Sequence, residues 1–339
     1  MRIAVVTDQK RASLLQNEEG ILEDEIKASV SKAVAKVLSK QHDVIELMMT
    51  DNFLTVLEKE KVDLVFNLCN GIEGESRISA LPFLLDYAKI AYTGAGPVPH
   101  GLAYNKIYSG HIFKGAGIPT PSFYTVNSAE EIKSLTLNYP VLVKPKDEGS
   151  SRGIHDDSLV YNEEALFLKI KENLVNYNPP MMITEYIEGR EFTVGVLGEG
   201  ENIKVLPILE IDFTNLPSNL NKIYSFEAKY VFESYVKYHL PARLEDELKE
   251  KIETMAKKAF NSLDLRDYSR IDFRVKDGIP YVIEINSLPG LHKESSDIVK
   301  MAFKAGLSYE DLIMTIAQNG LNRANINNRN KDQEMKTPV

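Results

Sequence analysis

The stretch YSRIDFRVKDGIPYVIEIN (268–286) reads as two β-strands joined by a tight turn at Asp277-Gly278. Side chains alternate between the two faces of a strand, so Arg270 and Asp272 share a face, as do Glu284 and Asn286. A loop with an odd number of residues would bring both pairs to the same side of the hairpin. A loop with an even number would separate them, because a shift by one residue moves every side chain to the other face.

Two carboxylates and an amide on one face would form a hard oxygen site. Such a set suits Mg²⁺, which takes one or two carboxylates and completes its shell with phosphate and water. Asp272, Glu284 and Asn286 are therefore candidate metal ligands. For the hairpin alone, a solvated polar face opposite a buried one explains the pattern about as well.

The segment after the hairpin holds small residues. Gly290, in SLPG (287–290), would allow a backbone N–H to approach a ligand closely. Ser295 and Ser296 follow, and a helix N-cap explains these two serines as well as a substrate contact does.

A lysine and a Gly/Ser loop lie upstream, in VLVKPKDEGSSRG (141–153). Lys144 stands among apolar residues at the end of a predicted strand, where its charge requires an anionic partner. The loop after it, with Ser150 and Ser151, could fold backbone N–H groups over phosphate oxygens. It lacks the Walker-type pattern, and a plain surface hairpin is the alternative.

Two acidic residues and a long loop follow in the chain. Glu185 and Glu191 could hold an adenine and a ribose, and surface solvation is the alternative for both. Residues 213–241 show no clear periodicity and predict a long functional loop, which includes Lys229 and Tyr230.

The N-terminal part alternates strands and helices. Predicted strands at 3–7, 43–49 and 62–68 and a helix at 24–38 indicate a parallel sheet. NGIEGES (70–76) follows the third strand at the edge where open α/β sheets bind ligands. A helix over 101–115 would carry Lys106, and a last helix is expected near 308–317. The polar, Asn-rich residues 319–339 predict a disordered tail.

Composition restricts the function classes. The chain has 339 residues, a formal charge of −9, 43% hydrophobic residues and one cysteine. These values indicate a cytoplasmic enzyme in a reducing compartment. No apolar run is long enough to span a membrane, and the acidic balance argues against nucleic-acid binding.

Together the motifs resemble the ATP-grasp ligases, and most closely the D-alanine–D-alanine ligase family. The resemblance rests on the order and spacing of NGIEGES (70–76), AYTGAG (91–96), YNKIYS (104–109), GIPTP (117–121), YPVLVKPKDEGSSRGI (139–154), EYIEGREFTV (185–194), EAKY (227–230), SRIDF (269–273), IEINSLPG (283–290) and AGLSYEDLI (305–313). It implies an α/β protein with an α+β C-terminal part and the three-domain ATP-grasp fold. The expected domains are an N-terminal parallel-sheet domain at 1–96, a central small domain at 97–185 and a C-terminal domain at 186–318.

The same resemblance implies a role for each candidate residue. ATP would contact Lys106, Lys144, Ser151, Glu185, Glu191 and Lys229, and two Mg²⁺ ions, or Mn²⁺, would be held by Asp272, Glu284 and Asn286. Arg270 and the Gly290 N–H would stabilise an oxyanion, Ser150 and Tyr230 would lie beside the amino-acid pocket, and Ser295 would contact the carboxylate of the second substrate. The expected partners are small amino-acid-like substrates, and a homodimer is expected from the family.

Four departures from the family pattern lie on the amino-acid side. Asn70 replaces a histidine, Ser76 an aspartate and Ser296 a leucine, and EDEIKAS (23–29) offers only Glu23 for an N-terminal motif. The hypothesis is a ligase that retains the ATP chemistry, acting either on two D-alanines or on another carboxylate and amine. A nucleotide-binding regulator without turnover and a module that holds a protein-borne acceptor are the alternatives.

Overall fold

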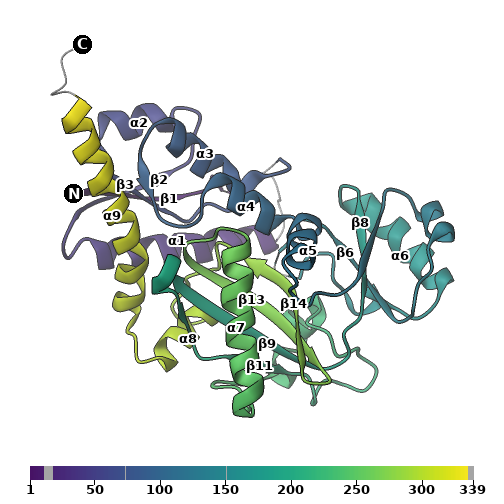
Figure 1. Cartoon of the computed structure of the whole chain (residues 1–339). Helices are drawn as coiled ribbons and strands as arrows, with labels where there is room; N and C mark the ends of the chain where they lie inside the picture. Colours follow the sequence, from purple (N-terminus) through teal and green to yellow (C-terminus); the bar gives the residue numbers. More distant parts are fainter. Residues whose placement is uncertain (11–17, 73, 150, 335–339) are drawn as a thin grey trace.

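The computed structural model describes residues 1–10, 18–72, 74–149 and 151–334, with the backbone alone for 18–23 and 326–334. Within these residues the chain forms three β-sheets, each covered by helices (Figure 1). One sheet is parallel and two are antiparallel, which confirms the predicted α/β class with an α+β C-terminal part.

The N-terminal sheet is parallel, with strand order β2-β1-β3-β4. Its strands are β1 (Arg2–Thr7), β2 (Asp43–Met48), β3 (Leu64–Asn67) and β4 (Ala91–Tyr92), and its chain segment also forms α1 (Glu18–Leu38), α2 (Phe53–Lys59), the 3-10 helix Arg77–Ser79 and α3 (Ala80–Tyr87). Because strand side chains alternate, Ile3 and Val5 join the core with α1, whereas Ala4 and Val6 join the core with α2 and α3. Both faces are covered, as parallel sheets require.

The central sheet is antiparallel, with order β5-β8-β6-β7, and extends to one side of the molecule (Figure 1). Its elements are β5 (Phe123–Val126), β6 (Val141–Pro145), β7 (Leu159–Val160), β8 (Met181–Glu185), α6 (Glu163–Asn176) and the 3-10 helices Ala129–Ser134 and Asp156–Ser158. Val141 and Val143 pack with α6 residues Leu166 and Ile170. Lys144 alternates with Val143 and therefore faces away from this core.

The C-terminal sheet is antiparallel, with order β12-β11-β9-β13-β14, and β10 pairs with β9. Its elements are β9 (Arg190–Gly198), the 3-10 helix Gly200–Asn202, β10 (Lys204–Val205), β11 (Leu209–Asp212), the π-helix Glu227–Val231, the 3-10 helix Glu233–Tyr235, β12 (Lys237–His239), α7 (Asp246–Ser262), β13 (Asp267–Lys276), β14 (Ile279–Asn286) and α8 (Asp297–Lys304). Phe192 and Phe273 pack against Ile252 and Phe260 of α7. The opposite face of β9, β13 and β14 carries the polar candidates.

The hairpin of β13 and β14 has an even, two-residue turn, yet it does not separate the two polar pairs. Lys276 pairs with Ile279, and Asp277 and Gly278 both have positive φ, as a type I′ turn requires. A β-bulge then shifts the register between Asp272 and Phe273, so that Asp272 pairs with Glu284. The expectation from loop length alone is thus corrected. The extra residue Ile283 at the bulge shifts the pairing by one residue, which returns Glu284 and Asn286 to the face that carries Arg270 and Asp272.

The predicted helix over 101–115 is two helices, α4 (Pro97–Tyr104) and α5 (Lys106–Gly115). Asn105 separates them in an extended conformation, and its side chain accepts hydrogen bonds from the N–H groups of Ile107 and Tyr108. Asn105 is therefore an N-cap, and it sets Lys106 in the first turn of α5.

The prediction of a disordered tail from residue 319 is wrong up to residue 334. The last helix, α9 (Tyr309–Glu334), continues through this segment, and Leu321 and Ala324 are buried in the core that contains β1 and β3. Arg323 forms ion pairs with Asp267 and Glu199. These few apolar and charged contacts order a helix whose overall composition is polar.

Candidate functional site

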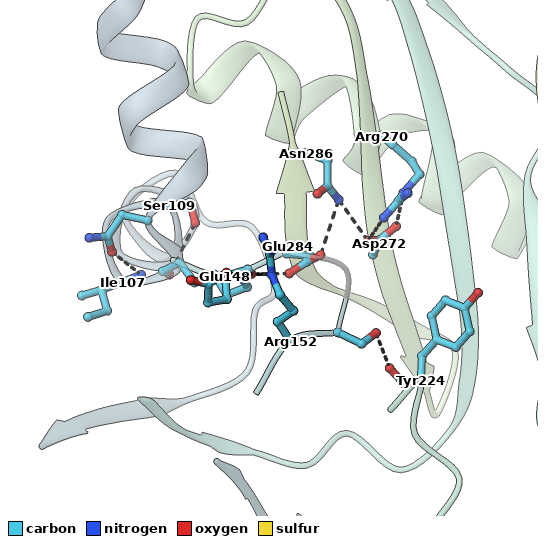
Figure 2. Close-up of polar contacts among 12 residues, drawn as sticks. Ile107, Ser109, Glu148, Arg152, Tyr224, Arg270, Asp272, Glu284 and Asn286 are labelled. Carbon is cyan, nitrogen blue, oxygen red and sulfur yellow. Dashed lines mark hydrogen bonds and ion pairs between the residues drawn. The ribbon is translucent and has the colours of Figure 1, made fainter. Parts of the chain in front are cut away.

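The four polar residues of the hairpin meet on one face (Figure 2). Arg270 donates to both oxygens of Asp272, at 3.0 Å from Nε and 3.0 Å from Nη2. The amide nitrogen of Asn286 lies 3.2 Å from an Asp272 oxygen and 3.4 Å from a Glu284 oxygen. The bulge therefore brings together the residues that the sequence predicted as one set.

Two buried lysines from other elements face this set. Lys106 Nζ, at the start of α5, lies 3.4 Å from a Glu284 oxygen. Lys144 is only 4% exposed, and burial together with the charge of Lys106 lowers its pKa to about 8. Burial alone would raise the pKa of Glu284, but Lys106 and Lys144 lower it to about 2. The lysines and Glu284 thus form one electrostatic group that holds more positive than negative charge.

A small pocket opens between the two lysines. Its wall includes Lys106, Lys144, Phe123, Met182, Thr184 and Ile283. The pocket combines apolar side chains with two cationic groups.

The two glutamates predicted near the nucleotide occupy different environments. Glu191, on β9, lies 3.3 Å from the Arg274 guanidinium, and burial raises its pKa to about 7. Glu185 is exposed at the end of β8, where its carboxylate accepts a 3.3 Å hydrogen bond from the Ser122 N–H. Only Glu191 shares the surroundings of Lys144 and Glu284.

The Gly/Ser loop and the long loop contact each other. Ser151 Oγ donates to the Tyr224 carbonyl at 2.9 Å, and the Phe226 N–H donates to the Ile154 carbonyl at 2.8 Å. His155 Nδ1 lies 2.8 Å from a Glu227 oxygen. The segment 213–241 is therefore not one irregular loop, because it contains helical turns and β12 and is tied to residues 151–155.

Lys229 and Tyr230 lie on the π-helix of this segment. Lys229 Nζ lies 5.7 Å from the ring centre of Tyr224 and 5.3 Å from that of Tyr230. Burial, followed by the charge of Arg270, lowers the pKa of Lys229. Tyr230 is 49% exposed and packs against Phe226.

Of the predicted substrate residues near the N-terminal sheet, Asn70 belongs to a connecting segment and Glu23 to a helix. Asn70 is exposed, and its N–H and that of Gly71 each donate to the buried Asp8 carboxylate at 2.9 Å. Glu23 lies in α1, but its side chain is outside the described residues, and Ser150 is outside them entirely.

The predicted substrate residues near α8, Ser295 and Ser296, both contact His292. Ser295 Oγ lies 2.9 Å from His292 Nδ1, while Ser296 Oγ accepts from the His292 N–H at 2.8 Å. Ser296 is the N-cap residue of α8, but its side chain does not cap the helix. A side chain at Gly290 would lie 3.1 Å from Ser296 Oγ, so this position has little room for anything larger than glycine.

Sequence reasoning missed three residues of the site. Thr193 donates to Asp272 from the neighbouring strand β9. The Glu148 carbonyl accepts from Lys106 Nζ. The Glu148 carboxylate lies within ion-pair distance of Arg152 (Figure 2) and also of Arg77. Asp297 lies 3.7 Å from Arg270. Glu148 could have been found from its place in the Gly/Ser loop, whereas Thr193 required the strand register.

The donor set fits a divalent cation that other ligands help to hold. Asp272 and Glu284 supply carboxylates and Asn286 an amide, which are ligands that Mg²⁺ accepts. Among the described residues there is no group of three or more His, Cys, Asp or Glu that could hold a metal ion. A metal here would therefore need further oxygen ligands, such as phosphate and water.

Comparison with known proteins points to one family. The sequence model of a family described as D-ala D-ala ligase C-terminus matches residues 112–318. The D-alanine–D-alanine ligase of Pseudothermotoga lettingae is 33% identical over 287 residues, covering 84% of this chain and 91% of that protein. An uncharacterised protein of Sinorhizobium fredii, y4sG, is 36% identical over 251 residues, covering 74% and 72%.

Solved structures share the fold. The ATP complex of the D-alanine–D-alanine ligase from Bacillus anthracis matches with a TM-score of 0.72 at 23% identity, covering 96% of this chain and 99% of that one. The VanG D-Ala:D-Ser ligase from Enterococcus faecalis matches with a TM-score of 0.72 at 21% identity, covering 94% and 99%. In the part of this chain that the structure describes, no helix is long and apolar enough to cross a membrane.

Proposed function

Because the chain belongs to the D-alanine–D-alanine ligase family, we propose that it is an ATP-dependent, ADP-forming ligase that joins the carboxylate of one amino acid to the amine of another. One observation carries this proposal. The bulge in β14 brings Glu284 and Asn286 beside Asp272, and Lys106 lies within ion-pair distance of Glu284.

Lys106 and Lys144 would bind the phosphates of ATP. Both are buried, so water screens their charge little, and a polyanion would satisfy the positive charge that Glu284 leaves uncompensated. The apolar wall beside them would hold the adenine, with Glu185 and Glu191 toward the adenine and ribose and Lys229 and Ser151 over the phosphates.

Asp272, Glu284 and Asn286 would hold Mg²⁺, as two ions, or Mn²⁺ in its place. The metal, when bound, polarises the phosphoryl oxygens and neutralises their charge. Asn286 turns its amide nitrogen toward both carboxylates, so its amide would have to rotate by half a turn to offer oxygen to a cation.

The reaction would proceed in two steps. An oxygen of the first substrate's carboxylate takes the γ-phosphoryl group, and ADP leaves. The nitrogen of the second substrate then attacks the carbonyl carbon, phosphate leaves and the amine loses a proton. Arg270 and the Gly290 N–H would stabilise the tetrahedral oxyanion between these events, and one such donor contributes about 2.7–4 kcal/mol.

The two loops would protect the acyl phosphate from water. The hydrogen bond from Ser151 to the Tyr224 carbonyl links the two loops. Ser150 and Tyr230 would line the amino-acid pocket beside them. Closure of such loops also completes the site around bound substrates.

The identity of the substrates is the open part of the proposal. The Pseudothermotoga lettingae relative and the Bacillus anthracis structure are named for D-alanine, and the Enterococcus faecalis structure is named for D-alanine and D-serine. Asn70, Ser76 and Ser296 depart from the family pattern on the amino-acid side, and Glu23 is the only counterpart of the N-terminal motif in residues 23–29. We propose amino-acid substrates, with Asn70 and Glu23 near the first and Ser295 and Ser296 near the second. The domain boundaries, a homodimer and a cytoplasmic location stay predictions.

The test is to incubate the purified chain with ATP, Mg²⁺ and a panel of D- and L-amino acids, followed by ADP measurement and product masses. We expect ADP and a dipeptide to form in equal amounts. ATP binding without ADP formation for any substrate would contradict the proposal and favour a nucleotide-binding regulator. Efficient turnover with D-alanine alone would exclude the altered-substrate alternative.

A further inference from the structure

Asp297 is a carboxylate beside the proposed reaction centre that the steps above do not use. It is the first residue of α8, and its side chain is 16% exposed. One oxygen lies 3.7 Å from Arg270 Nη1, and the other lies 3.6 Å from Lys300 Nζ. Arg270 is the residue that would stabilise the oxyanion, so Asp297 adjoins the place where the amine must attack.

The oxygens of Asp297 are less satisfied than those of its neighbour Asp272. Asp272 accepts hydrogen bonds from Arg270, Asn286 and Thr193. Among the described residues no donor lies within hydrogen-bond distance of Asp297, whose ion pairs are both longer. Carboxylates that are mostly buried normally accept hydrogen bonds, so Asp297 is suited to accept from a ligand.

Lys300 adds a positive charge next to this carboxylate. Its Nζ lies 5.4 Å from the ring centre of Tyr238, whose hydroxyl lies 2.9 Å from that of Tyr224. Lys300 is 38% exposed and accessible. The pair therefore presents a negative and a positive group side by side, next to Arg270 and walled by two tyrosines.

We propose that Asp297 and Lys300 are specificity-determining residues for the amine substrate. Asp297 accepts from its ammonium group as it binds, and Lys300 donates to its carboxylate. The ammonium group releases one proton to water before its nitrogen attacks. The amine substrate is then a free α-amino acid, because only a zwitterion satisfies both groups, whereas a hydroxy acid or an amino acid with a blocked carboxyl satisfies one. This inference rests on the proposed ligase function.

The alternative role for Asp297 is structural. An acidic residue in the first turn stabilises a helix through the macrodipole, and Lys300 lies one turn further along. A structural role predicts a change in melting temperature, whereas a specificity role predicts a change in the KM of the amine substrate.

The experiment measures ADP formation with D-alanine, D-serine, D-alaninamide and D-lactate as the second substrate. Asp297→Asn is expected to raise the KM for D-alanine or D-serine about tenfold or more and to leave the KM for ATP within about twofold, since a hydrogen bond to a charged group is lost. Asp297→Glu should recover part of this loss. Lys300→Gln should raise the KM for D-alanine but not that for D-alaninamide, which lacks the carboxylate.

Two control variants match these changes. Asp311→Asn removes an acidic residue from the first turn of α9, and Lys304→Gln removes an exposed lysine from the last turn of α8. Both should leave the KM of the amine substrate unchanged.

An unchanged KM in Asp297→Asn, with a lower melting temperature, would overturn the inference and assign a helix-terminal role. Equal effects of Lys300→Gln on D-alanine and D-alaninamide would remove the carboxylate contact. If Asp297→Asn does not fold, Asp297→Ser replaces it, and an unchanged KM ratio between D-alanine and D-lactate in that variant would overturn the inference equally. All of these outcomes require a wild-type chain that forms ADP. A wild-type chain that forms no ADP would instead contradict the proposed function itself.

Discussion

The proposed phosphate side and the proposed amino-acid side of the site are built from different kinds of structure. On the phosphate side, Lys106 is 9% exposed and begins helix α5, and Lys144 is 4% exposed and lies in strand β6. Both lysines face carboxylates on β14 and β9. Asn70 and Ser295 are exposed and lie in connecting segments, and Tyr230 is half exposed. One side is fixed by packing and strand register, and the other is held mainly by loops.

This difference explains where the sequence departs from its family. Loops tolerate substitution because few packed neighbours constrain them, whereas a buried charge can be changed only together with its partner. The departures at Asn70, Ser76 and Ser296 all lie in connecting segments or at a helix end. Under the proposed function, the phosphate contacts are the part that packing constrains, and the choice of substrates is the part that can vary.

The largest expected effect comes from the phosphate side. Glu284→Ala should reduce ADP formation by about 10³-fold, because Lys106 and Lys144 lose the carboxylate that orients them and the metal loses a ligand. Glu250→Ala, on the exposed face of α7, is the control. ADP formation above a tenth of the wild-type rate, with an intact fold by circular dichroism, would break the assignment of this side.

A pH series tests the same side through Lys144. Its pKa is about 8, so the side chain loses its charge as the pH rises through this value and binds phosphates less well. The kcat/KM for ATP should fall about fivefold between pH 8 and pH 9. In Lys144→Met the value should be lower throughout and lack this fall. The same fall in both proteins would show that another group titrates.

On the amino-acid side a substitution should change selectivity more than rate. Asn70→His should raise the use of D-alanine relative to other amino acids about fivefold, comparable to one gained hydrogen bond. Stability should hardly change, because the contact to Asp8 comes from the Asn70 backbone. An identical substrate profile in the variant and in the control Asn52→His would remove this position from the pocket.

The smallest effect on the reaction is expected from Arg323, which lies on neither side. Arg323→Gln leaves the fully buried Asp267 with a single hydrogen bond from Gly94 and should lower the free energy of unfolding by about 3 kcal/mol. Chemical denaturation would measure this loss, and Lys251→Gln on the surface is the control. A changed substrate profile in Arg323→Gln would contradict the view that Arg323 supports the fold without taking part in the site.

The sequence predicted which polar residues of the hairpin come together but not how the chain brings them together. The alternating polar residues indicated a shared face, and the Asp277-Gly278 turn was found correctly. No residue near Ile283 marks the bulge in the sequence. The bulge results from how β14 pairs with β13 and from where the turn sets that pairing. Register is a property of two strands, so one strand's residues cannot reveal it.

The helix boundaries show the same limit. Asn105 is a good N-cap, but the helical pattern of residues 101–115 hides the break before Lys106. In α9 the reverse holds, because a polar composition hides a helix that is ordered by a few contacts such as Leu321 and Arg323. In both places the tertiary contacts outweigh the average character of the segment.

The position of α9 has a consequence for biosynthesis. Leu64 of β3 and Ala91 of β4 share a core with Leu312, Ile313 and Ile316 of α9, which leave the ribosome some two hundred residues later. Until then the part of the N-terminal sheet formed by β3 and β4 lacks this helix over its apolar surface, as partly synthesised chains that risk aggregation do. These two strands are thus covered late, and a chaperone that shields nascent chains would act at this end of the molecule.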